Sequence, residues 1–329
     1  MGGSLSEPQA RDAFGIVMRG EATPAQVAAL LVGLRVKGET AAEVAGAADA
    51  LRGAMVRLPA ERPDLLVDTC GTGGGTIGTF NISTAAALLA AGLGVRIAKH
   101  GNRSFTSQCG SADVLEALGV PIEVSVDVME RALREAGIVF MFAPLMHPAM
   151  RHVGPVRSEL AIPTVMNIIG PLANPASAGR QVVGVADAAR VPLIAGALCA
   201  LGAVHALVVH GAPGMDEVSP LGVTSVVEIR DGTTREWTID PRAYGFEAGR
   251  AEELTGGPPA ENAAAVLAVL RNDAPPTAIA AVILNAAAAL YVSGSGPTNF
   301  GDAVDTAREG LRNGAGVAAL DRLRAAYTK

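Results

Sequence analysis

From Leu65 to Ile229 the chain alternates short apolar runs with alanine-rich helical patterns, and this alternation restricts its possible folds most. The apolar runs have the length of buried strands. We expect them at 65–68, 95–99, 138–142, 181–185 and 206–210. Helical patterns separate most of these runs, at 83–92, 111–119, 127–137 and 190–202. The repetition predicts an α/β domain with a mainly parallel central sheet, and the run 224–229 adds an antiparallel-looking strand.

The first 57 residues show a different pattern and read as three consecutive helices. Thr23 and Thr40 are suited to N-caps, and Pro24 stands at the first position of its helix. The segment LPAERPD at 58–64 then breaks the pattern with two prolines. We therefore expect a small all-helical domain over 1–63 and a larger α/β domain over 64–329.

Composition excludes several classes of protein. A formal charge of -6 and a pI near 5.5 argue against nucleic acid as a partner, because a phosphate-backbone footprint normally needs a basic excess. The three cysteines form no metal-type or even-numbered pattern, which indicates a reduced cytoplasm. No run of about 18 uncharged apolar residues is present, so no membrane span is expected.

The first candidate site is the stretch DTCGTGGGTIGTFNIST at 68–84. Its glycines match G-x-G-x-x-G after a strand, but a nicotinamide site also needs an acidic residue at the end of the next strand. That strand ends in Lys99 and His100, and no Lys-Ser or Lys-Thr follows the glycines as a P-loop requires. Free N–H groups that lead into a helix at Ser83 and Thr84 favour phosphate. The alternative is a tight turn with a helix cap.

Two further loops follow predicted strands. KHGNRSFTSQCGS at 99–111 contains many donors and no carboxylate, which suits an anionic ligand, whereas the alternative is a solvated loop. HGAPGMDEVSP contains adjacent Asp216 and Glu217, whose oxygens could hold Mg²⁺, although such a pair alone is usually a surface turn. The carboxyl ends of parallel strands collect ligands, so the three loops predict one site.

A fourth motif, FAPLMHPAMRHVGPVRSEL, contains His147 and Arg157. Arg157 could form a bidentate pair with a substrate carboxylate, while a lone histidine is more often structural. The sequence contains neither a zinc-like His/Cys cluster nor a G-x-S-x-G elbow, so metallohydrolase and serine-hydrolase functions have no support.

Five motifs in this order resemble the anthranilate phosphoribosyltransferase family: GTGGGTIGTFNISTAAA, AKHGNRSFTSQCGSADVLEALG, FAPLMHPAMRHVGPVRSEL, NIIGPLANPA and VVHGAPGMDEVSP. The likeness covers nearly the whole chain. It implies that a segment near 148–172 returns to the small helical domain, and that this domain forms a homodimer. It also implies a reaction in which the amine of anthranilate takes the phosphoribosyl group of 5-phosphoribosyl 1-diphosphate. Diphosphate is released, Mg²⁺ is required, and the step is the second in tryptophan synthesis from chorismate.

The resemblance also implies roles for individual residues. Phosphoribosyl diphosphate contacts fall on Gly71, Gly74, Gly75, Thr79, Asn81, Ile82, Ser83, Thr84, Lys99, His100, Gly101, Asn102, Arg103, Ser104, Phe105, Thr106, Ser107 and Ser111. Magnesium ligands fall on Ser83, Asp216 and Glu217, and anthranilate contacts on Gly71, Asn102, His147 and Arg157. Catalytic roles would fall on Lys99, Asn102 and Arg157.

The main departure from the family pattern is Gly75, where the commoner loop has an aspartate. The missing carboxylate puts magnesium demand and diphosphate affinity in doubt. Other functions stay open at this point: transfer to a different aromatic amine, a pyrimidine-nucleoside-phosphorylase-like reaction, a non-catalytic nucleic-acid-binding relative, or a nicotinamide dehydrogenase.

Overall fold

The computed structural model describes residues 2–104, 108–247 and 249–328. Three helices come first: α1 (Glu7–Met18), α2 (Pro24–Lys37) and α3 (Ala41–Gly53). Their N-cap side chains, from Ser6, Thr23 and Thr40, each accept a hydrogen bond from a backbone N–H in the first turn. The predicted helical start and its two threonine caps are confirmed.

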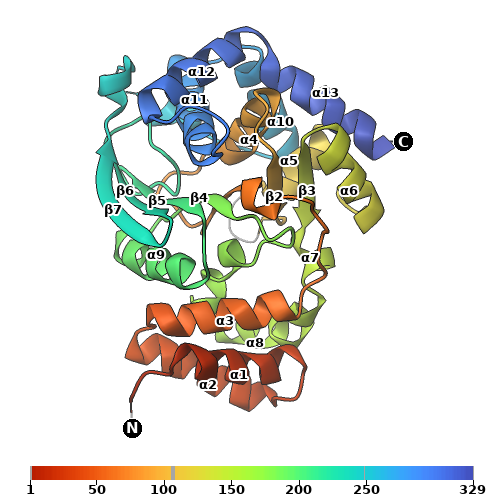
Figure 1. Ribbon diagram of the computed structural model, residues 1–329, viewed down its shortest axis with the longest axis vertical. Helices are drawn as coiled ribbons and strands as arrows, with labels where there is room; N and C mark the ends of the chain where they lie inside the picture. The colour runs from red at the N-terminus through yellow and green to blue at the C-terminus, as the bar shows by residue number, and fades with distance from the viewer. Residues whose placement is uncertain (1, 105–107, 248, 329) are drawn as a thin grey trace.

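A seven-stranded sheet in the order β3-β2-β1-β4-β5-β6-β7 forms the centre of the molecule (Figure 1). Its strands are β1 (Val67–Gly71), β2 (Ile97–Gly101), β3 (Ile138–Phe142), β4 (Arg180–Gly184), β5 (His205–Gly211), β6 (Thr224–Arg230) and β7 (Thr233–Ile239). The first five are mutually parallel, β6 is antiparallel to β5, and β7 is antiparallel to β6. The predicted fold class, a small helical domain with an α/β domain built on a mainly parallel sheet, is confirmed.

Most of the remaining helices cover the two faces of this sheet. They are α4 (Ile82–Gly92), α5 (Ser111–Ala117), α6 (Val126–Glu135), α9 (Val191–Ala200), α10 (Pro259–Leu270), α11 (Pro276–Val292), α12 (Phe300–Arg312) and α13 (Ala315–Thr328). Two short helices follow β3, namely α7 (Ala143–Met146) and α8 (Gly154–Leu160), and α8 packs against α2. Val182 packs into the core under α4 and α11, whereas Val183 packs on the opposite face with α9. This alternation is what a strand buried on both faces requires. None of the helices in the described ranges is long and apolar enough to cross a membrane.

The N-terminal helices pack beneath α9 (Figure 1). Phe14 and Val44 belong to the same apolar cluster as Val153 and Ile168, so the segment that the resemblance assigns to the small domain lies against these helices. A Cβ atom built on Gly196 of α9 would lie 2.9 Å from the Cβ of Ala41, because α3 and α9 approach closely. The domain boundary at 63/64 stays a prediction.

Some element bounds differ from those predicted. Pro63–Leu65 form a 3₁₀ turn, so β1 begins at Val67 and not at Leu65. Strand β7 and the helices α10 to α13 were not predicted. The signal for β7 was present: Asp231 and Gly232 have φ of 50° and 76°, and an Asp-Gly turn of this kind joins paired strands.

Candidate active site

The three predicted loops meet at the point where the order of the strands in the sheet reverses. The chain proceeds from β1 outward to β2 and β3, then returns to β4 on the other side of β1. In open α/β sheets such a switch point is where ligands bind, outside the carboxyl ends of the strands. We call residues 71–80 the glycine loop, 102–110 the donor loop and 212–217 the acidic loop; they follow β1, β2 and β5.

Two glycines facing each other at the switch point make room for the acidic loop. Gly71 and Gly184 are partners in the β1–β4 register. A Cβ on Gly184 would lie 1.6 Å from the carbonyl oxygen of Asp216, and a Cβ on Gly71 would lie 2.4 Å from its Oδ2. Because neither glycine has a side chain, the acidic loop can fold back across the ends of both strands.

Hydrogen bonds then connect the acidic loop to the glycine loop. The backbone N–H of Gly73 donates to Asp216 Oδ2 at 2.9 Å, and the N–H of Thr76 donates to the carbonyl of Gly214 at 3.1 Å. The Thr76 hydroxyl donates to the carbonyl of Pro213 at 3.2 Å. Motifs about 140 positions apart in the sequence therefore form one surface.

The donor set at this surface suits Mg²⁺. The side chains of Ser83, Asp216 and Glu217 line a cavity of about 10 Å³, roughly the space of one water molecule. Burial, and then the charge of Asp216, raise the pKa of Glu217 above its usual value.

No group of three or more His, Cys, Asp or Glu side chains that could hold a metal occurs in the described ranges. Mg²⁺ does not need such a group, since it typically binds one or two carboxylates and completes its shell with water and substrate phosphates. The residues present fit the ion.

Lys99 lies under the same surface and is only 3% exposed. Its ammonium donates to the carbonyl of Thr69 at 2.5 Å and to Ser83 Oγ at 3.3 Å. Burial lowers the pKa of Lys99, and the nearby charge of Asp68 opposes this effect. Burial likewise raises the pKa of Asp68 to about 6. The buried lysine thus brings positive charge next to Ser83.

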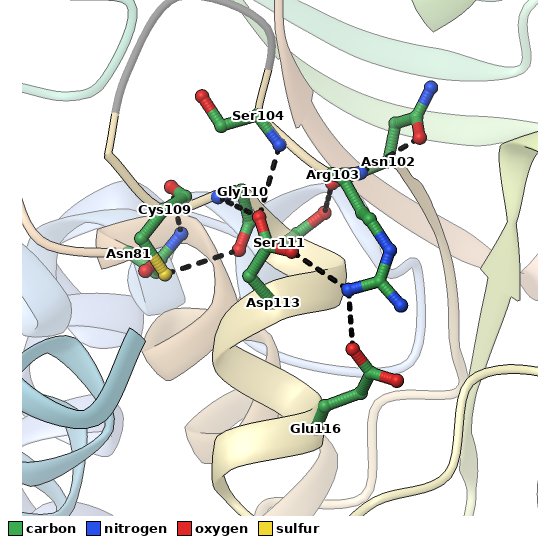
Figure 2. A network of polar contacts seen from close by, with 9 residues as sticks. All are labelled: Asn81, Asn102, Arg103, Ser104, Cys109, Gly110, Ser111, Asp113 and Glu116. Atoms are coloured by element: carbon green, nitrogen blue, oxygen red, sulfur yellow. Dashed lines mark hydrogen bonds and ion pairs between the residues drawn. The ribbon is translucent and has the colours of Figure 1, made fainter. Parts of the chain in front are cut away.

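The donor loop is joined to the end of the glycine loop through Asn81. The Asn81 Nδ2 donates to the carbonyl of Cys109 at 3.4 Å, and Asn262 Nδ2 donates to Asn81 Oδ1 at 2.9 Å. Asn102 Oδ1 accepts the N–H of Arg103 at 2.8 Å (Figure 2). The predicted contacts Phe105, Thr106 and Ser107 lie outside the described residues.

Arg103 and the two serines of the prediction lie around the helix that follows this loop. The guanidinium of Arg103 is paired with Asp113 and Glu116, at 2.9 and 2.5 Å (Figure 2). The Ser104 N–H also reaches Asp113, and Ser111 Oγ donates to the carbonyl of Asn102 at 3.4 Å.

Two histidines from different motifs form a pair at the base of the donor loop. The rings of His100, on β2, and His147, after α7, have centroids 4.8 Å apart. Burial lowers the pKa of His100 to about 3 and that of His147 to about 4, so both imidazoles are neutral at pH 7. His147 therefore lies next to the strand that carries Lys99, and its role as a substrate contact stays a prediction.

Arg157 is the predicted residue that the structure does not join to the others. It lies half-buried on α8, and burial lowers its pKa. Among the described residues, no hydrogen bond or ion pair of its guanidinium occurs. A partly buried cation of this kind is available to an anionic ligand.

The remaining predicted contacts shape the backbone. Gly74 has φ of 80°, Thr79 forms a bridge with Thr255, and Ile82 and Thr84 are buried in the first turn of α4. A Cβ on Gly101 would lie 2.1 Å from Ser111 Oγ.

Sequence reasoning missed several residues that hold the site. Asn174 donates to Asp68 at 2.7 Å, and Asn262 holds Asn81. Asn174 lies in the NIIGPLANPA motif, which indicated no role for this side chain, and Asn262 lies in none of the five motifs. Gly184 could not be singled out because its role depends on strand register. Asp113 had a local signal, since a carboxylate in the first turn of a predicted helix often caps it.

Comparison with known proteins supplies the identity of the fold's family. Residues 63–317 match a family model described as "Glycosyl transferase family, a/b domain", and residues 1–55 match one described as "Glycosyl transferase family, helical bundle domain". An anthranilate phosphoribosyltransferase from Rubrobacter xylanophilus is 49% identical over 98% of this chain and 93% of its own length. One from Roseiflexus sp. is also 49% identical, over 98% and 94%. The chain belongs to the anthranilate phosphoribosyltransferase family.

Solved structures of anthranilate phosphoribosyltransferases superpose closely. That from Thermus thermophilus has a TM-score of 0.94 and 42% identity, covering 100% of this chain and 97% of its own. One from Saccharomyces cerevisiae in complex with PRPP and Mg has a TM-score of 0.88 and 27% identity, covering 98% and 94%. The family resemblance stated from the five motifs is confirmed.

In this member of the anthranilate phosphoribosyltransferase family, Gly184→Ala is expected to lower kcat/KM by about 10²-fold, because the acidic loop must move by about 1 Å or more. Steady-state kinetics would measure this loss. The matched control is Gly33→Ala on α2, where a Cβ would meet nothing within 4 Å. Equal activity of the two variants would mean that the glycine pair does not set the position of Asp216.

Proposed function

We propose that this chain transfers the 5-phosphoribosyl group of 5-phosphoribosyl 1-diphosphate to the amine of anthranilate, giving N-(5-phosphoribosyl)anthranilate and diphosphate. Membership of the anthranilate phosphoribosyltransferase family supports the reaction and its Mg²⁺ requirement. The observation that carries the proposal is the hydrogen-bonded contact between the acidic and glycine loops at the switch point. It combines oxygen ligands for a cation with amides for phosphate.

In the proposed site the glycine loop and the start of α4 bind the phosphates. Ser83, Asp216 and Glu217 would hold Mg²⁺, which would supply positive charge against the departing diphosphate. Lys99 donates to Ser83 Oγ and so orients one of these ligands from below. Positive charge already in place where anionic charge develops stabilises a transition state without reorganisation.

The amine side of the reaction needs orientation more than proton transfer. An aromatic amine is neutral at pH 7, so its nitrogen can attack once it is held in line with C1 of the ribose. We propose that Arg157 pairs with the anthranilate carboxylate and that Asn102 and the His100–His147 pair border the ring. The low pKa values of both histidines support this arrangement, because neutral rings present no charge to the aromatic substrate.

The direct test follows anthranilate fluorescence with phosphoribosyl diphosphate and Mg²⁺ present, alongside a diphosphate-release assay. We expect anthranilate to disappear only when both are added. If a different aminobenzoate were consumed instead, the substrate assignment would be wrong and the reaction class would survive. Absence of diphosphate release with every amine tried would overturn the reaction itself.

Gly75→Asp is expected to lower the Mg²⁺ concentration that gives half-maximal rate, on the order of 3- to 10-fold. A Cβ at this position would lie 3.4 Å from Asp216 Oδ1 and 3.3 Å from the carbonyl of Gly214, so the side chain fits with a small shift. The added carboxylate would strengthen the negative field at the cation site. Magnesium titration at fixed phosphoribosyl diphosphate measures the effect.

The control for charge is Gly75→Asn, which has the same shape. Identical magnesium midpoints for the Asp and Asn variants would show that a charge at position 75 has no influence on the cation.

We further propose a homodimer formed through the small helical domain and a cytoplasmic location. Val36 on α2 is 82% exposed and Ile16 on α1 is 43% exposed, which supports an apolar contact there. All three cysteines are free, as expected in a reducing compartment. Light scattering of the purified protein would give the mass, and a monomer would contradict the dimer.

A further inference from the structure

A carboxylate on the first turn of α5 is shared by three groups of the donor loop. Asp113 Oδ2 accepts the backbone N–H of Ser104 at 3.1 Å and that of Gly110 at 2.8 Å. Asp113 Oδ1 lies 2.9 Å from Arg103 Nη1. The Asp113 side chain is only 16% exposed, and Figure 2 shows the donors converging on it. One residue therefore holds both the start and the end of the loop.

These bonds bring the two ends of the loop into contact. A Cβ built on Gly110 would lie 2.4 Å from the Ser104 nitrogen and 2.5 Å from the Asn102 carbonyl oxygen. The Asn102 carbonyl also accepts the N–H of Ala112 at 3.2 Å. The conformation next to Asn102 is thus determined by how the loop attaches to α5.

Asn102 is oriented by this attachment. Its Oδ1 accepts the N–H of Arg103, so its amide nitrogen points away from Asp113 (Figure 2). An amide held in this way can donate to a ligand without first reorganising. Any movement of Arg103 moves its N–H, and with it the direction of the Asn102 side chain.

The guanidinium of Arg103 reinforces the same attachment. It lies between Asp113 and Glu116 and 5.7 Å from the ring centroid of Phe142. Burial alone would raise the pKa of Asp113, but the N–H groups of Gly110 and Ser104 and the Arg103 guanidinium outweigh it and lower that pKa. Asp113 is therefore ionised at pH 7 and accepts all three donors at once.

We infer that Asp113 is a positioning residue for the transfer reaction, which fixes Arg103, Ser104 and Gly110 so that the Asn102 side chain meets phosphoribosyl diphosphate. This inference rests on the proposed function. Asp113 itself need not touch substrate, because it acts through Arg103, Ser104 and Gly110.

The test is Asp113→Asn, assayed by steady-state kinetics and by calorimetric binding of phosphoribosyl diphosphate with Mg²⁺. Asparagine has one acceptor oxygen and one NH₂ group in place of the two carboxylate oxygens. In one orientation the NH₂ group faces the Arg103 guanidinium, and in the other it faces the N–H groups of Ser104 and Gly110. Either way, a donor faces a donor and at least one of the Asp113 hydrogen bonds is lost. We expect kcat/KM for phosphoribosyl diphosphate to fall about 10- to 100-fold, as when a supporting residue of a site is lost, with a matching loss of affinity.

Two control variants separate this role from helix capping. Ser125→Ala removes the N-cap bond to Val128 on the neighbouring helix α6, at 3.4 Å, and should lower the melting temperature without changing kcat/KM. Glu116→Gln leaves the Asp113 contacts in place and keeps a side-chain oxygen that can accept from Arg103, so it should change kcat/KM by less than about twofold.

The inference is overturned if Asp113→Asn behaves like Ser125→Ala, with a lower melting temperature and unchanged kinetics and binding. Should Asp113→Asn be too unstable to purify, Asp113→Asn and Ser125→Ala are compared with each other in proteins that also carry Gly33→Ala. This substitution adds helix stability. Calorimetry also separates this inference from the proposed function. Wild-type protein that bound phosphoribosyl diphosphate without consuming anthranilate would contradict the function, while the affinities would still decide the role of Asp113.

Discussion

Replacing Asp216 with asparagine and Glu217 with glutamine together is expected to lower kcat by about 10³-fold or more, because the proposed cation site loses both of its carboxylates. The fold should survive. Burial and the neighbouring charge of Asp216 raise the pKa of Glu217, so a neutral side chain of the same shape is compatible with this buried position. We expect the melting temperature without Mg²⁺ to stay equal or to rise, and kinetics with thermal melting would measure both effects.

The matched control removes the same amount of charge elsewhere. Asp231→Asn with Glu236→Gln changes two exposed residues at the β6–β7 hairpin, where β6 ends at the sheet edge opposite the switch point. This pair should leave kcat within about twofold. Near-normal turnover by the Asp216 and Glu217 variant in Mg²⁺ would rule out the metal assignment, even if the melting data behaved as expected.

Arg157→Gln is expected to raise the KM for anthranilate about 10- to 100-fold and to leave the KM for phosphoribosyl diphosphate nearly unchanged. A charged hydrogen bond of this kind contributes about 1.5–3 kcal/mol, and 1.4 kcal/mol corresponds to a factor of ten. The guanidinium is half-buried and has no ion pair among the described residues, so little in the protein itself depends on its charge. Initial rates measured while the concentration of each substrate is varied in turn would give the two KM values separately.

The substrate provides a second test of Arg157. Aniline lacks the carboxylate, so its slow reaction should be equally slow with the wild type and with Arg157→Gln. Arg151→Gln, one turn before α8 and exposed, serves as the protein control. If Arg157→Gln instead raised the KM for phosphoribosyl diphosphate and left the KM for anthranilate unchanged, Arg157 would bind phosphoribosyl diphosphate and not anthranilate.

Much of the fold was predictable because its signals are local. Strand β3 and the centre of β5 are continuous apolar runs, and the threonine caps mark the starts of α2 and α3. The proximity of Asp216 to the glycine loop also followed from sequence, because loops after parallel strands share one edge of the sheet. The structure shows that proximity in the bond from Gly73, whereas the roles of the predicted site residues stay predictions.

What sequence could not predict depends on contacts between distant segments. The need for glycine at position 184 appears only when β1 and β4 are set in register and Asp216 lies above them. The link between Asn81 and Asn262 spans 181 residues of sequence. Arg103 was expected at the phosphates because it is a cation in a donor-rich loop. The predicted helix at 111–119 placed Asp113 and Glu116 directly after that loop, but their pairing with Arg103 depends on the loop folding back against α5.

The apolar cluster shared by the N-terminal helices and the underside of the sheet limits how this chain can be divided. Val183 and Val208, in the middle of the sheet, belong to the same cluster as Phe14, and α3 lies close enough to α9 to touch it through Ala41 and Gly196. A fragment that began near residue 64 would expose this surface to water and would tend to aggregate. Helices α1 to α3 therefore complete the hydrophobic core on one face of the sheet. The small helical domain and the α/β domain are best expressed and engineered together.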